Sequence, residues 1–234
     1  MKLIFSPRLE NENNRAYAYR ILRQNIMTCQ LVPGEALNEA ELAEAFQMSR
    51  TPIHEALTSL KEEWLVDILP QRGSSVSFIK IDYVKEGFSM RLMLEVGITE
   101  ALAGRLNSEQ LKAFSDNLAL EAAAVNRADF TQPSDTFQEL DNDFHELLYT
   151  FGGFSRVWKA MHTATSHYDR VRYLDTAINQ IDQSDILQQH KNFFNYLTIG
   201  IPSNANLHAD YELHLGRFRT GFQKVREVFP DYFI

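Results

Sequence analysis

Cysteine is nearly absent from this chain of 234 residues, because Cys29 is the only one. A single thiol excludes an internal disulfide and any zinc finger built from several cysteines. Long apolar runs are also missing, since no stretch of about eighteen apolar residues occurs, and no membrane-spanning helix is predicted. The apolar segment near the N-terminus is too short for a secretory signal. These features lead us to expect a bacterial-type cytoplasmic protein with no membrane partner.

Positive charge is scarce as well. Lys and Arg number 23 against 31 Asp and Glu, and the formal net charge is −8. The first 80 residues are almost balanced, with nine basic and ten acidic residues, so the deficit lies mainly in residues 81–234. Basic side chains of the N-terminal part could still gather on one surface: Arg15, Arg20, Arg23, Arg50, Lys61 and Arg72. The overall charge therefore neither supports nor excludes binding to nucleic acid.

The N-terminal part shows helical periodicity in three segments. Apolar residues recur every three or four positions over residues 15–29, and a shorter segment with the same pattern covers 38–46. After a brief turn, a third helix is expected to run to about residue 63. Ser49 or Thr51 could cap this third helix, because a hydroxyl can accept from the free N–H groups of the first turn.

After the third helix the periodicity changes to that of strands. Residues 65–70 and 74–79 predict two short strands joined by a turn at 71–73. Three helices followed by a β-hairpin form a winged helix-turn-helix, which we expect to occupy residues 1–80. Residues 81–234 are poor in strand signals and predict an all-α bundle with helices near 90–106, 108–126, 134–151, 155–177, 184–199 and 204–228. The fold class is therefore expected to be mainly α.

A helix-turn-helix inserts the N-terminal end of its second helix into the major groove of DNA. At that end, Arg50 can contact a phosphate or a guanine, Thr51 can contact a phosphate or a thymine methyl, and His54 faces the same groove. Arg72 and Gly73, between the predicted strands, suit contact with the DNA backbone or the minor groove. An exposed helical hairpin with incidental arginines is the alternative, and the wing at the expected distance favours DNA binding.

A second group of polar residues predicts a metal site in the C-terminal part. Asp141 and His145 are four residues apart in a helical segment, so both side chains project from one face. A carboxylate and an imidazole at that spacing can share a divalent cation, although such a pair more often forms a surface hydrogen bond. His190 and His214 lie in later helices among apolar residues, where a histidine is usually a structural core residue. Several such histidines in one domain favour the metal site.

The N-terminal residues resemble the DNA-binding domain of GntR-type regulators. The resemblance rests on several short segments at fixed spacing: 31–39, 41–43, 49–52, 55–57 and 71–73. It implies a winged helix that binds double-stranded operator DNA. Two positions depart from the family pattern. His54 stands where the family usually has arginine, so a strong contact with a base or a phosphate is expected to be weakened or altered. Ala40 stands where some members have arginine, which implies a changed operator preference.

The C-terminal residues resemble the FCD ligand-binding domain that accompanies one GntR branch, the FadR type. The segments that carry this resemblance are 91–95, 141–145, 189–190 and 214–215. The resemblance implies that zinc, nickel or manganese is held inside the bundle, next to a pocket for a small organic acid. The four implied metal ligands are Asp141, His145, His190 and His214.

Three arginines are candidates for binding the carboxylate of such an effector. Arg91 is expected to face the cavity, and Arg170 or Arg172 could join it, because a guanidinium pairs well with a carboxylate. Arg91 could instead form an internal salt bridge with Glu95, four residues later. The other histidines, His162, His167 and His208, match no motif and are expected to be structural or exposed.

We therefore expect a ligand-responsive transcriptional regulator rather than an enzyme. A homodimer would place two recognition helices on successive turns of the major groove, and an effector beside the metal would shift its affinity for DNA. One alternative is a metal-dependent enzyme, but Tyr149 replaces the second histidine of a His-Glu-x-x-His motif, and no catalytic residues stand out. The other is a regulator that senses the metal itself. Operator sequence, effector, metal identity, the sign of regulation and the domain arrangement stay open.

Overall fold

A computed structural model describes residues 2–69, 73–127, 135–179 and 183–234 of the chain. The N-terminal elements are α1 (Asn14–Met27), β1 (Ala36–Leu37), α2 (Glu39–Ala45), α3 (Arg50–Glu62), β2 (Val66–Leu69) and β3 (Gly73–Val76). The later helices are α4 (Ile81–Leu102), α5 (Ser108–Arg127), α6 (Asp135–Phe151), α7 (Ser155–Ala164), α8 (Ser166–Asn179), α9 (Gln183–Ile199), α10 (Leu207–Leu215) and α11 (Phe218–Val228), followed by a 3₁₀ turn, Pro230–Tyr232. The mainly helical fold class is thus confirmed.

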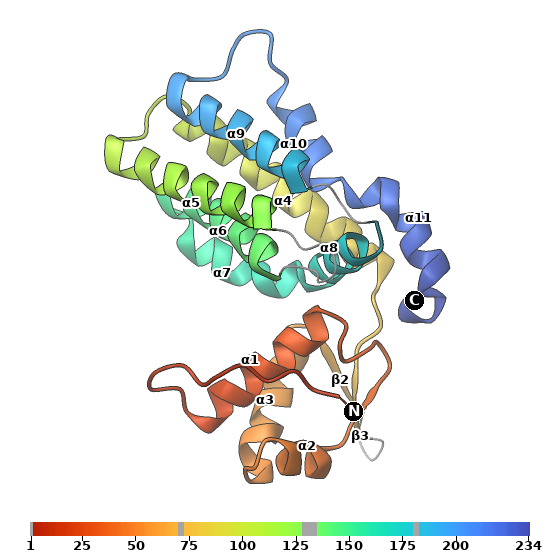
Figure 1. Ribbon diagram of the computed structural model, residues 1–234. Helices are drawn as coiled ribbons and strands as arrows, with labels where there is room; N and C mark the ends of the chain where they lie inside the picture. Colours follow the sequence, from red (N-terminus) through yellow and green to blue (C-terminus); the bar gives the residue numbers. More distant parts are fainter. Residues whose placement is uncertain (1, 70–72, 128–134, 180–182) are drawn as a thin grey trace. The chain divides into compact units, whose positions relative to one another are not determined.

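The N-terminal elements form the expected winged helix. Helices α1 and α2 both pack against α3 (Figure 1), and apolar side chains from all three helices fill one buried core. Strands β2 and β3 form an antiparallel hairpin, with Val66 opposite Val76. Strand β1, which was not expected, pairs with the other edge of β3, so the sheet order is β1-β3-β2.

The two helices of the helix-turn-helix begin differently. Asn38 caps α2, because its side chain accepts hydrogen bonds from the backbone N–H groups of Ala40 and Glu41. Ser49 occupies the equivalent position before α3, but its side chain makes no capping hydrogen bond. The turn between the helices includes Gln47 in the left-handed region, with φ of 53°. The expected side-chain cap of α3 by Ser49 is therefore not formed.

The helices after the wing differ in their bounds from those expected. Helix α4 already begins at Ile81, rather than near residue 90. The helix expected over 155–177 is two helices, α7 and α8, and the one expected over 204–228 is also two, α10 and α11. Helix α5 packs against both α6 and α9 (Figure 1), and α9 also contacts α10. These four helices carry the site described below.

The chain divides into two compact units that do not follow one cut in the sequence. The first unit comprises Met1–Gly87, His162–Leu174 and Phe222–Ile234, and the second comprises Phe88–Met161 and Asp175–Gly221. Within the first unit, part of α8 packs on the winged helix. Ser166 Oγ donates to the carbonyl oxygen of Glu63 at 2.9 Å, and Arg170 Nη1 donates to that of Ser77 at 2.9 Å. The domain bounds 1–80 and 81–234 stay a prediction.

Candidate functional site

Helix α6 carries two of the predicted metal ligands on its buried face. Phe144 and Leu148 are fully buried on this helix, and their packing turns the same side of α6 toward the interior. Asp141 and His145 lie on that side, one helical turn apart, and are 2% and 0% exposed. A carboxylate and an imidazole are therefore held out of water on one rigid helix.

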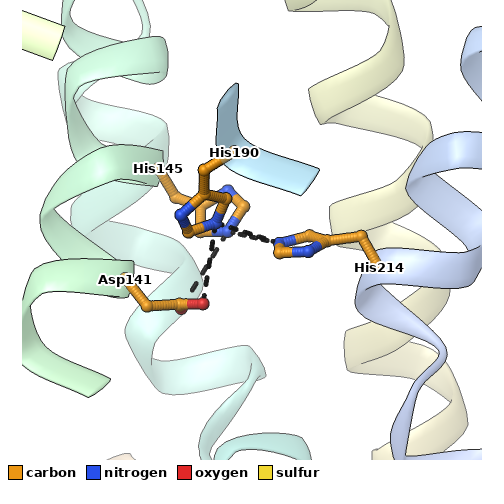
Figure 2. Close-up of side chains that lie close together, drawn as sticks. All are labelled: Asp141, His145, His190 and His214. Carbon is orange, nitrogen blue, oxygen red and sulfur yellow. Dashed lines mark hydrogen bonds and ion pairs between the residues drawn. The ribbon is translucent and has the colours of Figure 1, made fainter. Parts of the chain in front are cut away.

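Two later helices bring the remaining candidates to the same point. His190 lies on α9 and is fully buried, and His214 lies near the end of α10 and is 8% exposed. In Figure 2, dashed lines link the imidazoles of His145 and His190 both to the carboxylate of Asp141 and to the imidazole of His214. One ligand atom from each of the four residues lies within 4.8 Å of all the others. The structure thus brings together all four residues that were predicted from the sequence.

The nitrogen atoms that face the centre of this cluster are the Nε2 atoms. The Nε2 atom of His214 lies 3.1 Å from that of His145 and 3.3 Å from that of His190. The Asp141 carboxylate is slightly farther away, with 3.7 Å from Oδ1 to His190 Nε2 and 4.0 Å from Oδ2 to His145 Nε2. Three nitrogens and one oxygen therefore surround a single point.

Each imidazole has an acceptor beside its other nitrogen, Nδ1. The Nδ1 atom of His190 lies 2.9 Å from both carboxylate oxygens of Glu121, a buried residue of α5. The Nδ1 atom of His214 lies 2.8 Å from Oε1 of Gln189. The third ring has a carboxylate in the same place, since His145 Nδ1 lies 2.8 Å from Oε2 of Glu95 in α4, although this ion-pair contact lies outside hydrogen-bond geometry.

These partners decide which nitrogen of each ring carries the proton. A carboxylate can only accept, so an imidazole beside it places its hydrogen on Nδ1, and a neutral ring then has a bare lone pair on Nε2. Gln189 places the hydrogen of His214 on Nδ1 when its amide oxygen faces that atom. With hydrogen on Nδ1 of all three rings, the Nε2 lone pairs at 3.1–3.3 Å would repel one another, and a cation between them would remove this repulsion. Metal-binding histidines commonly donate their second N–H to a carboxylate or carbonyl group in this way. The residues present fit a divalent cation.

The electrostatics of the buried groups agree with this reading. Burial lowers the pKa of His145, and that of His214 to well below its ordinary value, which keeps both rings neutral and able to bind a metal. Burial alone would raise the pKa of Glu95, but the charge of the Arg91 guanidinium, with His145 as a further partner, outweighs burial and lowers that pKa to about 2. Metal ligation requires deprotonated donors, and these rings meet that condition.

Charge balance also favours a divalent ion. Burial raises the pKa of Glu121, but when ionised the carboxylates of Glu95, Glu121 and Asp141 place three negative charges around the imidazoles. One guanidinium, that of Arg91, contacts this group through Glu95. Negative charge gathered in a buried environment is costly, and a cation of charge +2 would offset part of it.

The sequence did not reveal the residues that orient these rings. Glu121 and Gln189 were assigned no role, and Glu95 was considered only as a partner of Arg91. Glu121 did leave one signal, because it is an isolated acid within an apolar run, Leu118 to Val125 in sequence. Its contact with His190 depends on the packing of α5 against α9, which the periodicity of either helix alone does not specify.

The predicted effector-binding arginines lie in different units. Arg91 is buried in the unit that holds the cluster, and its Nε donates to Glu95 Oε1 at 2.7 Å. This is the internal salt bridge that the sequence offered as the alternative to effector binding. Arg170 and Arg172 belong to the unit that contains the winged helix. Arg170 is fully buried there, and Arg172 is paired with Asp169 at 3.3 Å. A role in effector binding stays a prediction for all three.

On the winged helix, the predicted DNA contacts of α3 face solvent. Arg50, Thr51 and His54 are exposed, whereas Ile53 and Leu57 of the same helix are buried in the core. This pattern leaves the N-terminal end of α3 open along one side.

The wing and the expected basic surface are described only in part. Gly73 is exposed at the start of β3, with φ of 87°, a conformation that favours glycine. Arg72 lies outside the described residues. Two of the other basic residues are committed to ion pairs: Arg20 with Glu12 at 2.7 Å and Arg23 with Glu63 at 2.8 Å. Their positive charge is therefore largely compensated.

Comparison with known proteins identifies both parts of the chain. Residues 14–76 match the family described as bacterial regulatory proteins, gntR family, and residues 86–205 match the FCD domain. The HTH-type transcriptional repressor RspR of Escherichia coli K12 is 33% identical over 92% of this chain and 91% of its own length. An HTH-type transcriptional regulator of Streptomyces ambofaciens is 32% identical over 94% of this chain and 89% of its own.

Solved structures share the fold at lower identity. E. coli McbR/YncC has a TM-score of 0.70 at 16% identity, covering 93% of this chain and 99% of its own. A putative GntR regulator from Rhodococcus sp. RHA1 has a TM-score of 0.68 at 19% identity, over 91% and 97% of the two chains. Among the described residues, no helix is long and apolar enough to cross a membrane. The chain belongs to the GntR family of transcriptional regulators, in the branch that carries an FCD domain.

Proposed function

We propose that this protein is a ligand-responsive transcriptional regulator that binds operator DNA as a homodimer in the bacterial cytoplasm. Its winged helix would bind the DNA, and its helical domain would hold a divalent cation with a small organic acid beside it. The observation that carries the metal part is the convergence of three Nε2 atoms whose rings have acceptors beside Nδ1.

The DNA contacts in this proposal come from α3 and the wing. Arg50, Thr51 and His54 would enter the major groove, while Arg72 and Gly73 would contact the backbone or the minor groove. The exposure of the three α3 side chains, together with the buried opposite face of the helix, supports this assignment. A twofold symmetric dimer would present two such helices to two half-sites.

The cation in this proposal is held by Asp141, His145, His190 and His214. Three imidazoles and one carboxylate suit zinc, nickel or manganese, and they leave coordination positions for water or an effector carboxylate. Arg91 is the arginine best supported as a partner for that carboxylate, because it belongs to the same unit and contacts Glu95, which lies beside His145.

Burial favours the organic acid, rather than the metal, as the signal. The four ligands are at most 8% exposed, and a cation enclosed to that degree exchanges slowly. The cation would then be a permanent anchor, and the acid would bind and leave. Differential affinity of the acid for two states of the protein would change the population that binds DNA.

Operator binding measured without metal, with metal, and with metal plus a candidate acid tests the proposal. DNA that binds the purified protein is first selected from a random duplex library, and retardation is then measured with chelator, with metal, and with metal plus short hydroxy, keto and dicarboxylic acids. We expect an acid to change the affinity only in the metal-loaded protein. A response to metal alone, with none to any acid, would identify the metal as the signal.

Two arginine variants provide the control for DNA binding. Arg50→Ala should weaken binding to the selected DNA about tenfold or more, because it removes a phosphate or base contact. Arg156→Ala removes the same charge from an exposed position of α7 and should leave the affinity unchanged. Equal behaviour of the two variants, or no DNA selected by a folded protein, would contradict the proposal.

A further inference from the structure

The recognition helix α3 carries a histidine that is held by a carboxylate of the preceding helix. The Nδ1 atom of His54 lies 2.8 Å from Oε1 of Glu39, the first residue of α2. Both side chains are accessible, with 62% of His54 and 36% of Glu39 exposed. The pair therefore lies on the open side of the helix-turn-helix and plays no part in its core.

The local structure keeps the two side chains together. Asn38 caps α2 and so positions Glu39 at the very start of that helix. Helix α2 packs against α3, where the buried side chains of Ile53 and Leu57 flank His54 in sequence and fix the side of α3 that faces outward. The contact thus joins two helices whose mutual position is set by the apolar core.

This contact leaves one nitrogen of His54 for DNA. The Glu39 carboxylate only accepts hydrogen bonds, so the imidazole hydrogen lies on Nδ1. In the neutral ring, Nε2 then presents a lone pair. The free oxygen of Glu39 is also an acceptor, so the pair as a whole presents acceptors and no donor.

The bases of DNA differ in what they offer such a surface. In the major groove, adenine presents its N6 amino group and cytosine its N4 amino group as donors, whereas guanine presents only the acceptors N7 and O6. An arginine at the same position has donors only and selects guanine. Replacement of arginine by a histidine paired with glutamate would therefore reverse this preference.

We propose that His54 accepts a hydrogen bond from the exocyclic amino group of an adenine or a cytosine in the major groove, and that Glu39 is the positioning residue that holds the ring in the required tautomer. The proposal rests on the operator binding proposed above. At the position of His54, the proposal thus assigns a preference for adenine or cytosine, whereas an arginine there would prefer guanine.

Base analogues test this contact directly. In the DNA selected by the wild-type protein, each adenine is replaced in turn by nebularine and each cytosine by a 2-pyrimidinone nucleoside, which lack the amino group. Loss of one hydrogen bond at one position per half-site should lower the affinity about fivefold. The same replacement should have no effect on His54→Ala, and the sensitive base tells adenine from cytosine.

Three further variants separate the roles of the two residues. Glu39→Gln can offer either an oxygen or an NH₂ group to Nδ1, so discrimination should fall while the selected DNA is still bound. Glu41→Gln, an equal change at an exposed position of α2, should keep full discrimination. His54→Arg should lose sensitivity to the amino group, and on DNA selected anew with this variant it should become sensitive to 7-deazaguanine, which lacks N7.

The outcomes distinguish this inference from the function on which it rests. If the folded wild-type protein selects no DNA, both fail. If it binds specific DNA but no amino-group deletion weakens binding, or if 7-deazaguanine weakens binding of the wild-type protein at the position that depends on His54, only the inference is overturned. The second result would mean that an imidazolium donates from Nε2. Equal discrimination by Glu39→Gln and the wild-type protein would remove the role of Glu39.

Discussion

The Nε2 atoms of His145 and His214 lie 3.1 Å apart, although the two residues are separated by 69 positions in the sequence. Nδ1 of His214 is already occupied by Gln189 at 2.8 Å. Two imidazole nitrogens at this distance attract each other only through a proton or a cation. Burial lowers the pKa of both rings and so disfavours an imidazolium, which leaves a neutral N–H donor or a shared cation between the two nitrogens. The cation is the bridge in the function proposed above.

Removal of one ligand should therefore remove both the metal and the stability that it provides. His190→Ala should purify with little metal, and its Tm should match that of wild-type protein treated with chelator. A ligand present at a hundredfold excess over its Kd contributes roughly 3 kcal/mol, which corresponds to a Tm shift on the order of 5–10 °C. Metal content by mass spectrometry and thermal unfolding measure the two effects.

The matched control for this prediction is His208→Ala. His208 is an exposed histidine of α10, the helix that also carries His214. This variant should keep its metal and its chelator-dependent shift in Tm. Full metal content in His190→Ala would contradict the assignment of the site.

Glu121→Gln should weaken metal binding without removing a ligand. Both oxygens of Glu121 lie 2.9 Å from His190 Nδ1, whereas a glutamine could turn its NH₂ group toward that atom and favour the tautomer with hydrogen on Nε2. Loss of such an orienting partner typically costs about 10- to 100-fold in metal affinity. Competition with a chromophoric chelator measures the change. Glu109→Gln, at an exposed position of α5, is the control, and equal affinity in both variants would refute the role of Glu121.

The stability of the protein should respond differently to alanine at the starts of the two helices of the helix-turn-helix. Asn38→Ala removes a side chain that accepts from two N–H groups at the start of α2, and it should lower the free energy of unfolding by about 1 kcal/mol. Ser49→Ala removes no capping hydrogen bond from α3 and should cost clearly less. Urea unfolding of both variants gives the comparison. A larger loss for Ser49→Ala would show that the hydroxyl caps α3 after all.

Acid should destabilise the protein through His167, a buried residue of α8. Burial, together with the nearby charges of Arg170 and Lys80, lowers its pKa from 6.5 to about 3. The unfolded chain therefore takes up a proton below about pH 6.5 while the folded chain does not, so this contribution to stability is present above that pH and is lost progressively as the pH falls toward 3.

The variant His167→Asn isolates this contribution. Its side-chain oxygen can still accept from the backbone N–H of Lys80, which donates to His167 Nδ1 at 3.2 Å. Denaturant midpoints of both proteins at a series of pH values should therefore fall less steeply for the variant between pH 6.5 and 4. The metal ligands are common to both proteins, so their titration cancels in the difference. Parallel curves would show that His167 is not the group responsible.

Some elements of the fold could be predicted closely because their signals are local. The three N-terminal helices and the hairpin follow from apolar periodicity and from its change after residue 63. The break between α7 and α8 carries no glycine or proline and could not be located in this way. Ser166, at the start of α8, instead donates its hydroxyl to the carbonyl of Glu63, a contact over 103 positions.

The sequence by itself determined the kind of domain and the types of the site residues. Helical spacing places Asp141 and His145 on one face, and the short motifs identify His190 and His214, because both kinds of signal depend on neighbours along the chain. Only the tertiary structure decided which nitrogen of each ring is available. Each of these nitrogens is set by a side chain on a different helix: Glu121 contacts His190, Gln189 contacts His214, and Glu39 contacts His54. Such contacts arise from helix packing, which the local sequence pattern does not encode.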